Sequence, residues 1–217
     1  LPRETMANWI IYTAENYFYL IYDRLHEELL KRDLVHADET TCQVLREKGR
    51  TAEQTSYMWL YTTGSDALTP IVLYDYQPSC KGSCAQNFPE GFRGLVQCDG
   101  YQGYNKLGKA VNYAQNRKDT LMTYLEDGHC SLSNNLSKNA IRPFTVGRKN
   151  WLFSASPKGA ASSAIVYTMV EMAKANDLNT YKYLTYLLSQ RPNDKMSDEQ
   201  LEHLAPWSET AKANCQN

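Results

Sequence analysis

The sequence contains no long hydrophobic run. No apolar stretch approaches the roughly 20 residues that a membrane-spanning helix requires, and no charged-then-apolar leader opens the chain. We therefore expect no membrane partner and a cytoplasmic location.

The sequence also lacks the spacing of cysteines and histidines that is typical of a zinc site. The chain has six cysteines and four histidines, and Cys80 and Cys84 form the only close cysteine pair. No second pair or neighbouring histidine completes a tetrahedral zinc set. Cytoplasmic thiols are expected to be reduced, so we favour a loop with incidental thiols over a zinc site.

Acidic residues are missing from residues 128 to 170, although the net charge of the whole chain is only −1. The cations in this stretch make it a candidate phosphate-contacting face. A solvated basic surface is the plain alternative. The five cations are Lys138, Arg142, Arg148, Lys149 and Lys158.

What is present suffices for one globular domain, since 42% of the 217 residues are hydrophobic. Apolar residues recur at helical spacing over about residues 5–31 and predict a long helix. We assign the apolar stripe of this helix, which includes Trp9 and Tyr12, to packing in the core.

Short segments rich in β-branched and aromatic residues follow and predict strands. Three of them form an expected antiparallel meander, at residues 34–41, 57–63 and 70–76. A fourth, at residues 94–98, is reached by a crossover and is expected to lie parallel to the first.

The rest of the chain has helical patterns, which makes the fold class α/β. Pro143 is expected to end a short helix that Asn134 and Asn135 begin. Ser156 and Pro157 are expected to cap and open another. The other predicted helices are residues 107–126, 180–189 and 198–204.

Asp38 and Asp99 each follow or end a strand-like segment. A carboxylate beside a central strand loses water unless something compensates the charge. If the first and fourth strands are neighbours, a shared divalent cation explains both residues, which points to metal-dependent phosphoryl transfer. Glu39 is expected to face the opposite side of the sheet, and His36 to be a packed or solvated histidine.

Several motifs in order resemble the insertion sequence sixty-six family of transposases, the TnpC-type DDE enzymes. The likeness covers nearly the whole chain, from the first helix to about residue 190. The motifs are His36-Ala-Asp-Glu-Thr40, Tyr57-Met-Trp-Leu60, Cys98-Asp-Gly-Tyr-Gln-Gly-Tyr104, Tyr124-Leu-Glu-Asp-Gly128, Asn134-Asn135, Ala140-Ile-Arg-Pro143 and Gly147-Arg-Lys-Asn-Trp-Leu-Phe153.

The resemblance implies an RNase H-like catalytic core and DNA transposition, by nicking of DNA and strand transfer. It implies Mg²⁺ or Mn²⁺ held by Asp38 and Asp99, and DNA as the partner, with other proteins of the same element and a homo-oligomer as further possibilities. We divide the chain into an N-terminal helix (1–33), the catalytic core (34–176) and a C-terminal helical tail (177–217).

Three departures from the family pattern predict impairment. Lys138 stands where the family has its third acidic residue, and a cation there repels a metal ion instead of binding it. A segment of the family is missing near residues 105–110, so the fifth, edge strand of the sheet is expected to be absent. The family's N-terminal region is also missing, which suggests a decayed or truncated copy.

Two alternatives remain open at this point. Lys138 could contact DNA directly, and the chain could be a catalytically inactive DNA-binding remnant that uses Arg142, Arg148, Lys149 and Lys158 on phosphates. A general RNase H-like nuclease shares the chemistry but has no support from the motifs.

Overall fold

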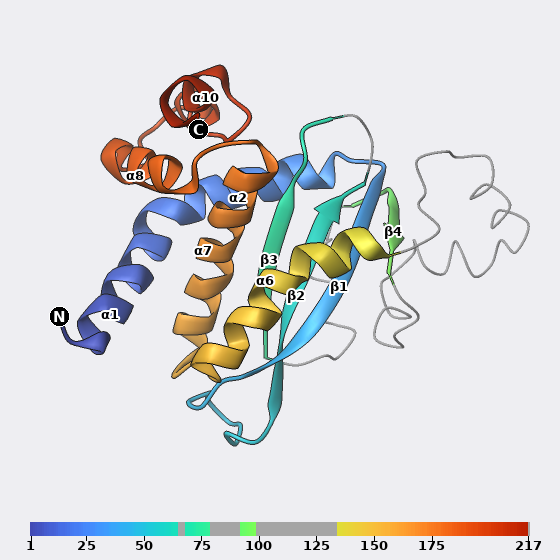
Figure 1. The fold of residues 1–217 in the computed structure, drawn as a ribbon, viewed down its shortest axis with the longest axis vertical. Coiled ribbons are helices and arrows are strands. Elements are labelled where there is room, and N and C mark those ends of the chain that lie inside the picture. The colour runs from blue at the N-terminus through green and yellow to red at the C-terminus, as the bar shows by residue number, and fades with distance from the viewer. Residues whose placement is uncertain (65–67, 79–91, 99–133, 217) are drawn as a thin grey trace, which may run out of the picture.

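The computed structural model describes residues 1–64, 68–78, 92–98 and 134–216. In these ranges a four-stranded sheet is flanked by helices (Figure 1). The elements are α1 (Arg3–Thr13), η1 (Ala14–Phe18), α2 (Tyr19–Leu30), β1 (Leu34–Gln43), β2 (Thr55–Thr63), β3 (Val72–Gln77), β4 (Leu95–Gln97), α6 (Asn135–Trp151), α7 (Pro157–Ala175), α8 (Thr180–Gln190), α9 (Asp198–Glu202) and α10 (Glu209–Cys215).

The strand order is β3-β2-β1-β4. β1 pairs antiparallel with β2 and β2 with β3, whereas β1 and β4 are parallel. The predicted meander and the parallel fourth strand are both confirmed. The described residues therefore form an α/β fold with one mixed sheet.

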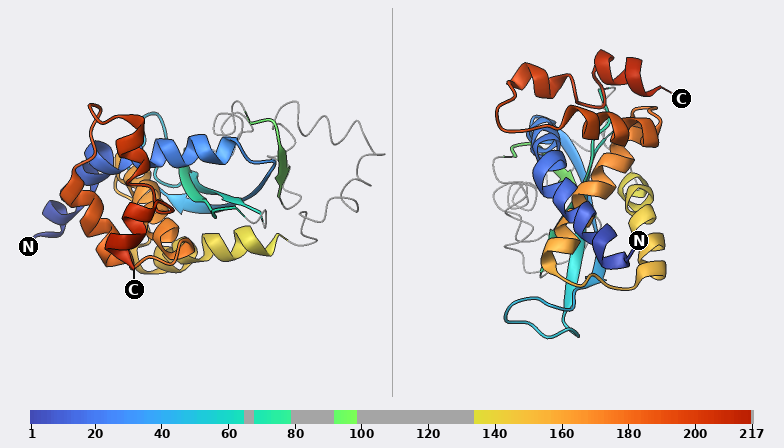
Figure 2. Two further views of the ribbon diagram at one scale, coloured as in Figure 1. Left: turned by 90° about the horizontal axis from the view of Figure 1, so that it is seen from above. Right: turned by 90° about the vertical axis from the view of Figure 1, so that its left-hand side faces the viewer.

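Helices cover both faces of the sheet, with α2 on one side and α6 on the other (Figure 2). On the α2 side, the Tyr22 hydroxyl donates to the Tyr74 carbonyl over 2.9 Å. On the α6 side, the Tyr74 hydroxyl donates to the Ala140 carbonyl. Strand side chains alternate between these two faces, so register decides which residues lie under α6.

Helix α7 protects the outer edge of β3. The backbone N–H of Tyr74 donates to Thr168 Oγ1 over 2.9 Å, and that of Val72 to the sulfur of Met172 over 3.0 Å. These bonds occupy donors that an open edge would offer to another chain. The predicted start of α7 is also confirmed, because the Ser156 hydroxyl accepts from the Gly159 N–H and Pro157 is the first helical residue.

The prediction that a helix ends before Pro143 was wrong. α6 passes through Pro143 and is 17 residues long. The proline removes one helical hydrogen bond, but Ile141 and Phe144 on either side of it are buried in the core. Burial of this helix face outweighs the local loss.

The N-terminal helix was predicted over about residues 5–31 and is found as α1, η1 and α2 in succession, with a π-helical segment at η1. Its second half packs as expected, since Ile21, Leu25 and Leu29 are buried. Assigning Trp9 and Tyr12 to the core was wrong, because both are more than half exposed. α1 extends beyond the sheet, so most of its surface has no layer to pack against (Figure 1).

The C-terminal helices pack beside α7 at one end of the sheet (Figure 1). α8 and α9 were predicted, and the structure shows a full capping box at Ser197 and Gln200 at the start of α9. α10 was not predicted. The backbone N–H of Asn179 donates to the Cys215 carbonyl over 2.7 Å and ties α10 to the start of α8. None of the helices in the described ranges combines the length and apolar character that crossing a bilayer demands. The predicted helix at 107–126 lies outside the described residues.

Candidate active site and an adjoining pocket

Asp38 lies in the middle of β1, in register with Leu60 of β2. Leu60 is in register with Tyr74 of β3, whose hydroxyl bonds α6, so Asp38 is on the α6 face of the sheet. The side chain is buried, and its Oδ1 accepts from the Glu39 N–H over 2.9 Å. A buried carboxylate in a central strand is what the sequence predicted for this position.

The start of α6 is attached to β1 one residue before Asp38. The Asn134 side chain stands at the N-cap position but makes no capping bond. Its Nδ2 instead donates to the Ala37 carbonyl over 3.2 Å. The N-terminus of a helix, which carries a partial positive charge, is therefore held against the strand that bears Asp38.

His36 is fully buried beside this attachment, and it shares a strand face with Asp38. Neither of its ring nitrogens meets the geometry of a hydrogen bond to a described residue, and the same holds for Asn134 Oδ1. Burial lowers the pKa of His36, while the nearby Asn134 side chain opposes that shift. A neutral, packed histidine agrees with the expectation.

Lys138 lies one turn into α6, where its N–H donates to the Asn134 carbonyl over 3.1 Å. Its side chain is exposed. The position expected for the third acidic residue is thus on the helix end that adjoins Asp38, and a cation occupies it.

Asp99 lies outside the described residues. β4 ends at Gln97, which pairs with His36 in the parallel register. Within the described ranges, no three His, Cys, Asp or Glu side chains gather closely enough to hold a metal ion. Of the two predicted metal ligands, only Asp38 lies within the described residues.

The four predicted phosphate contacts differ in their surroundings. Lys158 forms an ion pair with Glu15 over 2.7 Å. Arg148 Nη1 donates to Thr40 Oγ1 over 3.2 Å and to Thr41 Oγ1 over 2.8 Å, and also to the Thr41 carbonyl.

Arg142 and Lys149 are exposed, and neither forms an ion pair within the part of the chain that the structure describes. At about 100° per residue, they lie within about 20° of each other around α6. Lys138 falls on the same stripe of the helix. α6 contains no acidic residue, so this stripe is uniformly positive.

The opposite face of the sheet carries other carboxylates. Glu39 and Asp75 flank Trp59 in register across β1, β2 and β3. Burial raises the pKa of Asp75 to about 6, and a hydrogen bond from Gln77 opposes the shift. Glu39 thus faces away from Asp38, as expected.

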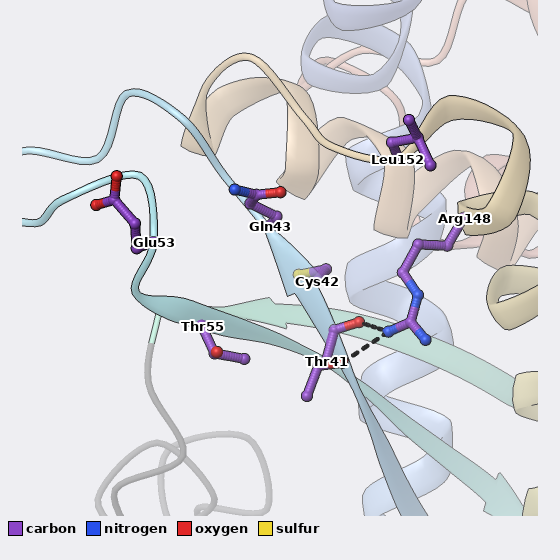
Figure 3. Close-up of a pocket in the computed structure, with 7 residues that line it drawn as sticks. All are labelled: Thr41, Cys42, Gln43, Glu53, Thr55, Arg148 and Leu152. Atoms are coloured by element: carbon purple, nitrogen blue, oxygen red, sulfur yellow. Dashed lines mark hydrogen bonds between the residues drawn. The ribbon is translucent and has the colours of Figure 1, made fainter.

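A polar pocket opens beyond Asp38, between α6 and the hairpin that joins β1 to β2 (Figure 3). Its volume is about 380 Å³. Burial raises the pKa of the Cys42 thiol to about 12, so this sulfur is a poor nucleophile. The lining residues are Thr41, Cys42, Gln43, Glu53, Thr55, Arg148 and Leu152.

The hairpin beside the pocket is held by a buried carboxylate. Glu47 pairs with Arg50 over 2.6 Å and accepts from the Ser56 hydroxyl over 2.7 Å and from the Tyr76 hydroxyl. Arg50 also donates to the Thr55 carbonyl over 2.8 Å. The pocket wall formed by this hairpin is therefore fixed to the sheet.

Reasoning from sequence missed this pocket and the role of Asn134. The residues that line the pocket come from separate elements, so their spacing in the sequence does not mark them as one site. Asn134 was read as a helix cap, because its residue type suits that role, whereas its bond to a strand depends on tertiary packing.

A family model described as the transposase IS66 family matches residues 1–109 and 105–162, and a second, the IS66 C-terminal element, matches residues 168–207. The chain belongs to the IS66 transposase family. The resemblance inferred from its motifs is confirmed.

Two proteins from Sinorhizobium fredii (strain NBRC 101917 / NGR234) are similar to this chain. The uncharacterized protein y4qI is 33% identical over 106 residues, which are 49% of this chain and 20% of y4qI. The uncharacterized protein y4hP is 29% identical over 97 residues, 45% of this chain and 17% of y4hP. The match thus spans about a fifth or less of each relative's length. No solved structure matches the chain.

Proposed function

We propose that this chain is the catalytic part of an RNase H-like DDE transposase, acting on DNA ends, with an active site impaired by Lys138. The observation that carries the proposal is the parallel pairing of β1 with β4, which aligns His36 with Gln97. Asp38 and Asp99 each follow two residues later in the sequence. Our prediction that the two carboxylates bind one ion requires β1 and β4 to be neighbours, as they are, although Asp99 itself lies outside the described residues.

Transposases of this kind generally use a divalent metal ion, for which Asp38 and Asp99 are the proposed ligands. Asp38 suits the role because it is buried in a central strand, and Mg²⁺ prefers such oxygen donors. Metal ions held by Asp38 and Asp99 would supply activation of the nucleophile and stabilisation of the leaving oxygen of a phosphodiester. The set is incomplete at residue 138, so we expect weak metal binding.

The residues of α6 have separate proposed tasks. The bond from Asn134 to Ala37 fixes the helix end relative to Asp38. Arg142 and Lys149 contact DNA phosphates, since they are exposed and without acidic neighbours in α6. Arg148 and Lys158 are partly engaged by Thr41 and Glu15, so their contribution to the binding of duplex DNA is expected to be smaller.

We also propose that a segment of the family's core is missing near residues 105–110, together with the fifth strand. The two stretches of the family match meet at residues 105–109, which supports a break in the family pattern there. No described strand lies beyond β4.

The second candidate function is a DNA-binding remnant without catalytic activity. The uniformly positive stripe of Lys138, Arg142 and Lys149 favours it, because these residues need no metal to bind phosphates. Such a protein could occupy element ends and block an intact transposase.

The deciding experiment is Lys138→Glu, assayed for Mg²⁺-dependent nicking of an element-end duplex. We expect the unmodified chain to nick barely above background and the variant to gain at least about tenfold, because the third carboxylate is restored. Lys138→Gln is the matched control, since it removes the positive charge without adding a ligand.

Nicking at full rate by the unmodified chain would show that Lys138 does not impair it. Equal DNA binding by all three proteins, with no cleavage by any, would favour the remnant. The slope of log affinity against log salt counts the phosphate contacts independently, and Lys149→Gln should reduce its magnitude by about 1.

A further inference from the structure

The chain makes a strained turn immediately after α6. Leu152 has φ 62 and ψ −48, and the Phe153 N–H donates to the Trp151 carbonyl over 2.7 Å. This is a γ-turn with positive φ at its centre, the rare and strained kind. Strained backbone of this sort concentrates at binding and catalytic sites.

The turn displays its two apolar side chains to solvent. Leu152 is 63% exposed and Phe153 is 45% exposed. The backbone on either side is anchored, because Leu152 N–H bonds the Arg148 carbonyl and Ser154 N–H bonds the Gln43 carbonyl. The exposed pair is thus held in place at the end of β1.

This turn borders the polar pocket. Leu152 and Arg148 form one wall and Glu53, from the β1–β2 hairpin, lies on the other side (Figure 3). A volume of about 380 Å³ falls within the range of sites for small ligands. Hydroxyls of Thr41 and Thr55 line the space between the walls.

Arg148 is prepared to bind an anion. Its bonds to Thr40 and Thr41 all use Nη1. They leave Nε and Nη2 without a hydrogen-bond partner in the described ranges. A guanidinium held by one nitrogen loses little freedom when the others bind a phosphate.

We propose that this pocket binds one unpaired nucleotide of a single-stranded DNA end, with its phosphate on Arg148 and its base against Leu152 and Phe153. Arg148 and Leu152 line the pocket, and the exposed aromatic residue Phe153 follows Leu152 directly in the chain. Proteins bind single-stranded nucleic acids by combining cationic side chains with exposed aromatic rings. The Glu53 carboxylate can accept from the amino group of cytosine or adenine. The proposal rests on the proposed DNA function and adds a site for unpaired DNA.

Paired bases cannot use this site, because their faces are covered within the duplex stack. The test therefore compares a labelled duplex carrying a short cytosine tail with the same duplex blunt-ended. Fluorescence anisotropy with the full chain, in the presence of EDTA, measures both affinities without cleavage.

Phe153→Ala should weaken binding of the tailed duplex about tenfold, within the range for loss of one base stack, and change blunt-duplex binding less than twofold. Leu152→Gly removes the second apolar contact and relieves the positive φ, so it should weaken tail binding without lowering the melting temperature. Tyr181→Ala, at a side chain that is 79% exposed on α8, is the matched control and should change neither affinity. Glu53→Gln should reduce the preference for cytosine over thymine tails.

Equal affinity of the unmodified chain for tailed and blunt duplexes would overturn the pocket assignment and leave the proposed DNA function standing. So would a Phe153→Ala variant that binds tails normally. Failure to bind either DNA would overturn both proposals.

Discussion

Asn134 stands at the first turn of α6, but its side chain bonds the neighbouring strand instead of the helix. The carbonyl that it bonds lies one residue before Asp38, so Asn134 attaches the start of α6 to β1 next to the candidate site. His36, two residues before Asp38 in β1, is fully buried.

Asn134→Ala should lower the free energy of unfolding by about 1 kcal/mol, because one hydrogen bond is lost and the Ala37 carbonyl loses its donor. Urea denaturation measures this. Asn135→Ala, at the exposed neighbouring position, is the control and should change stability by less than about 0.5 kcal/mol. If the two variants were equally stable, Asn134 would have no special role in holding α6.

The raised pKa of Asp75 predicts how the free energy of unfolding changes with pH. Its pKa is about 6 in the folded protein against an ordinary 3.8, so the folded state binds a proton more tightly than the unfolded state. This contribution is present below about pH 4 and is lost as pH rises to about 6.

Asp75→Asn should therefore be more stable than the unmodified chain at pH 7.5, by about 2 kcal/mol, and equally stable near pH 4. Denaturant unfolding at both values tests this. Glu27→Gln, at an exposed carboxylate of α2, serves as the comparison. A difference between Asp75→Asn and the unmodified chain that grows toward acid pH would contradict burial as the cause of the raised pKa.

At the scale of elements, α6 and α7 touch through Gly147. A Cβ at that position would collide with the hydroxyl of Tyr167. The glycine lowers helix propensity, yet it permits the aromatic cluster of Tyr167, Phe144 and Trp151, in which the other two rings lie 5.2 and 5.3 Å from that of Phe144.

Gly147→Ala should destabilise the protein by about 1–3 kcal/mol, as overpacked sites do, although alanine is the better helix former. Tyr167→Phe removes the colliding oxygen, so the double variant should recover most of that loss. Thermal melting of both singles and the double, as a mutant cycle, measures the coupling. Additive effects would show that the two residues do not compete for space.

The elements that sequence predicted well are those whose pattern is local. The meander of β1, β2 and β3 followed from short runs of β-branched and aromatic residues, and the start of α7 from Ser156 and Pro157. α6 was misread because Pro143 is a local signal that tertiary burial of Ile141 and Phe144 overrides.

The residues of the candidate site show the same difference between local sequence signals and tertiary packing. Asp38 was identifiable, because a carboxylate in an apolar strand is conspicuous in sequence. The bond of Arg148 to Thr41 and the pocket beside it depend on how α6 crosses β1, which no spacing encodes. The sequence predicted only that Arg148 contacts phosphates. The structure adds its bond to Thr41 and its position in the pocket wall.

At the scale of the molecule, one core joins the N-terminal helix, the sheet and the C-terminal helices. Buried residues from all three, such as Phe18, Trp59 and Tyr183, belong to a single cluster. Arg24 and Glu202 add an ion pair between α2 and α9 over 2.7 Å. The proposed divisions at residues 33 and 176 are therefore expected to be functional and not separate folding units.

The full chain should unfold in urea as one transition, with tryptophan fluorescence and far-UV circular dichroism coinciding. Removing residues 177–217 should lower the midpoint, because the core loses the buried α8 residues Tyr183 and Leu187. Coincident curves for the full and shortened chains, or an earlier transition confined to residues 177–217 in hydrogen exchange, would contradict this.

The π-helical segment Ala14–Phe18 sets the direction in which α1 displays its side chains. One residue more or less in a helix turns everything before it by about 100°. Loss of a single residue from this segment would swing Trp9 and Ile10 around the helix axis while the sheet stayed intact. The orientation of this outer arm is thus governed by backbone winding at one point, and a one-codon deletion could redirect it.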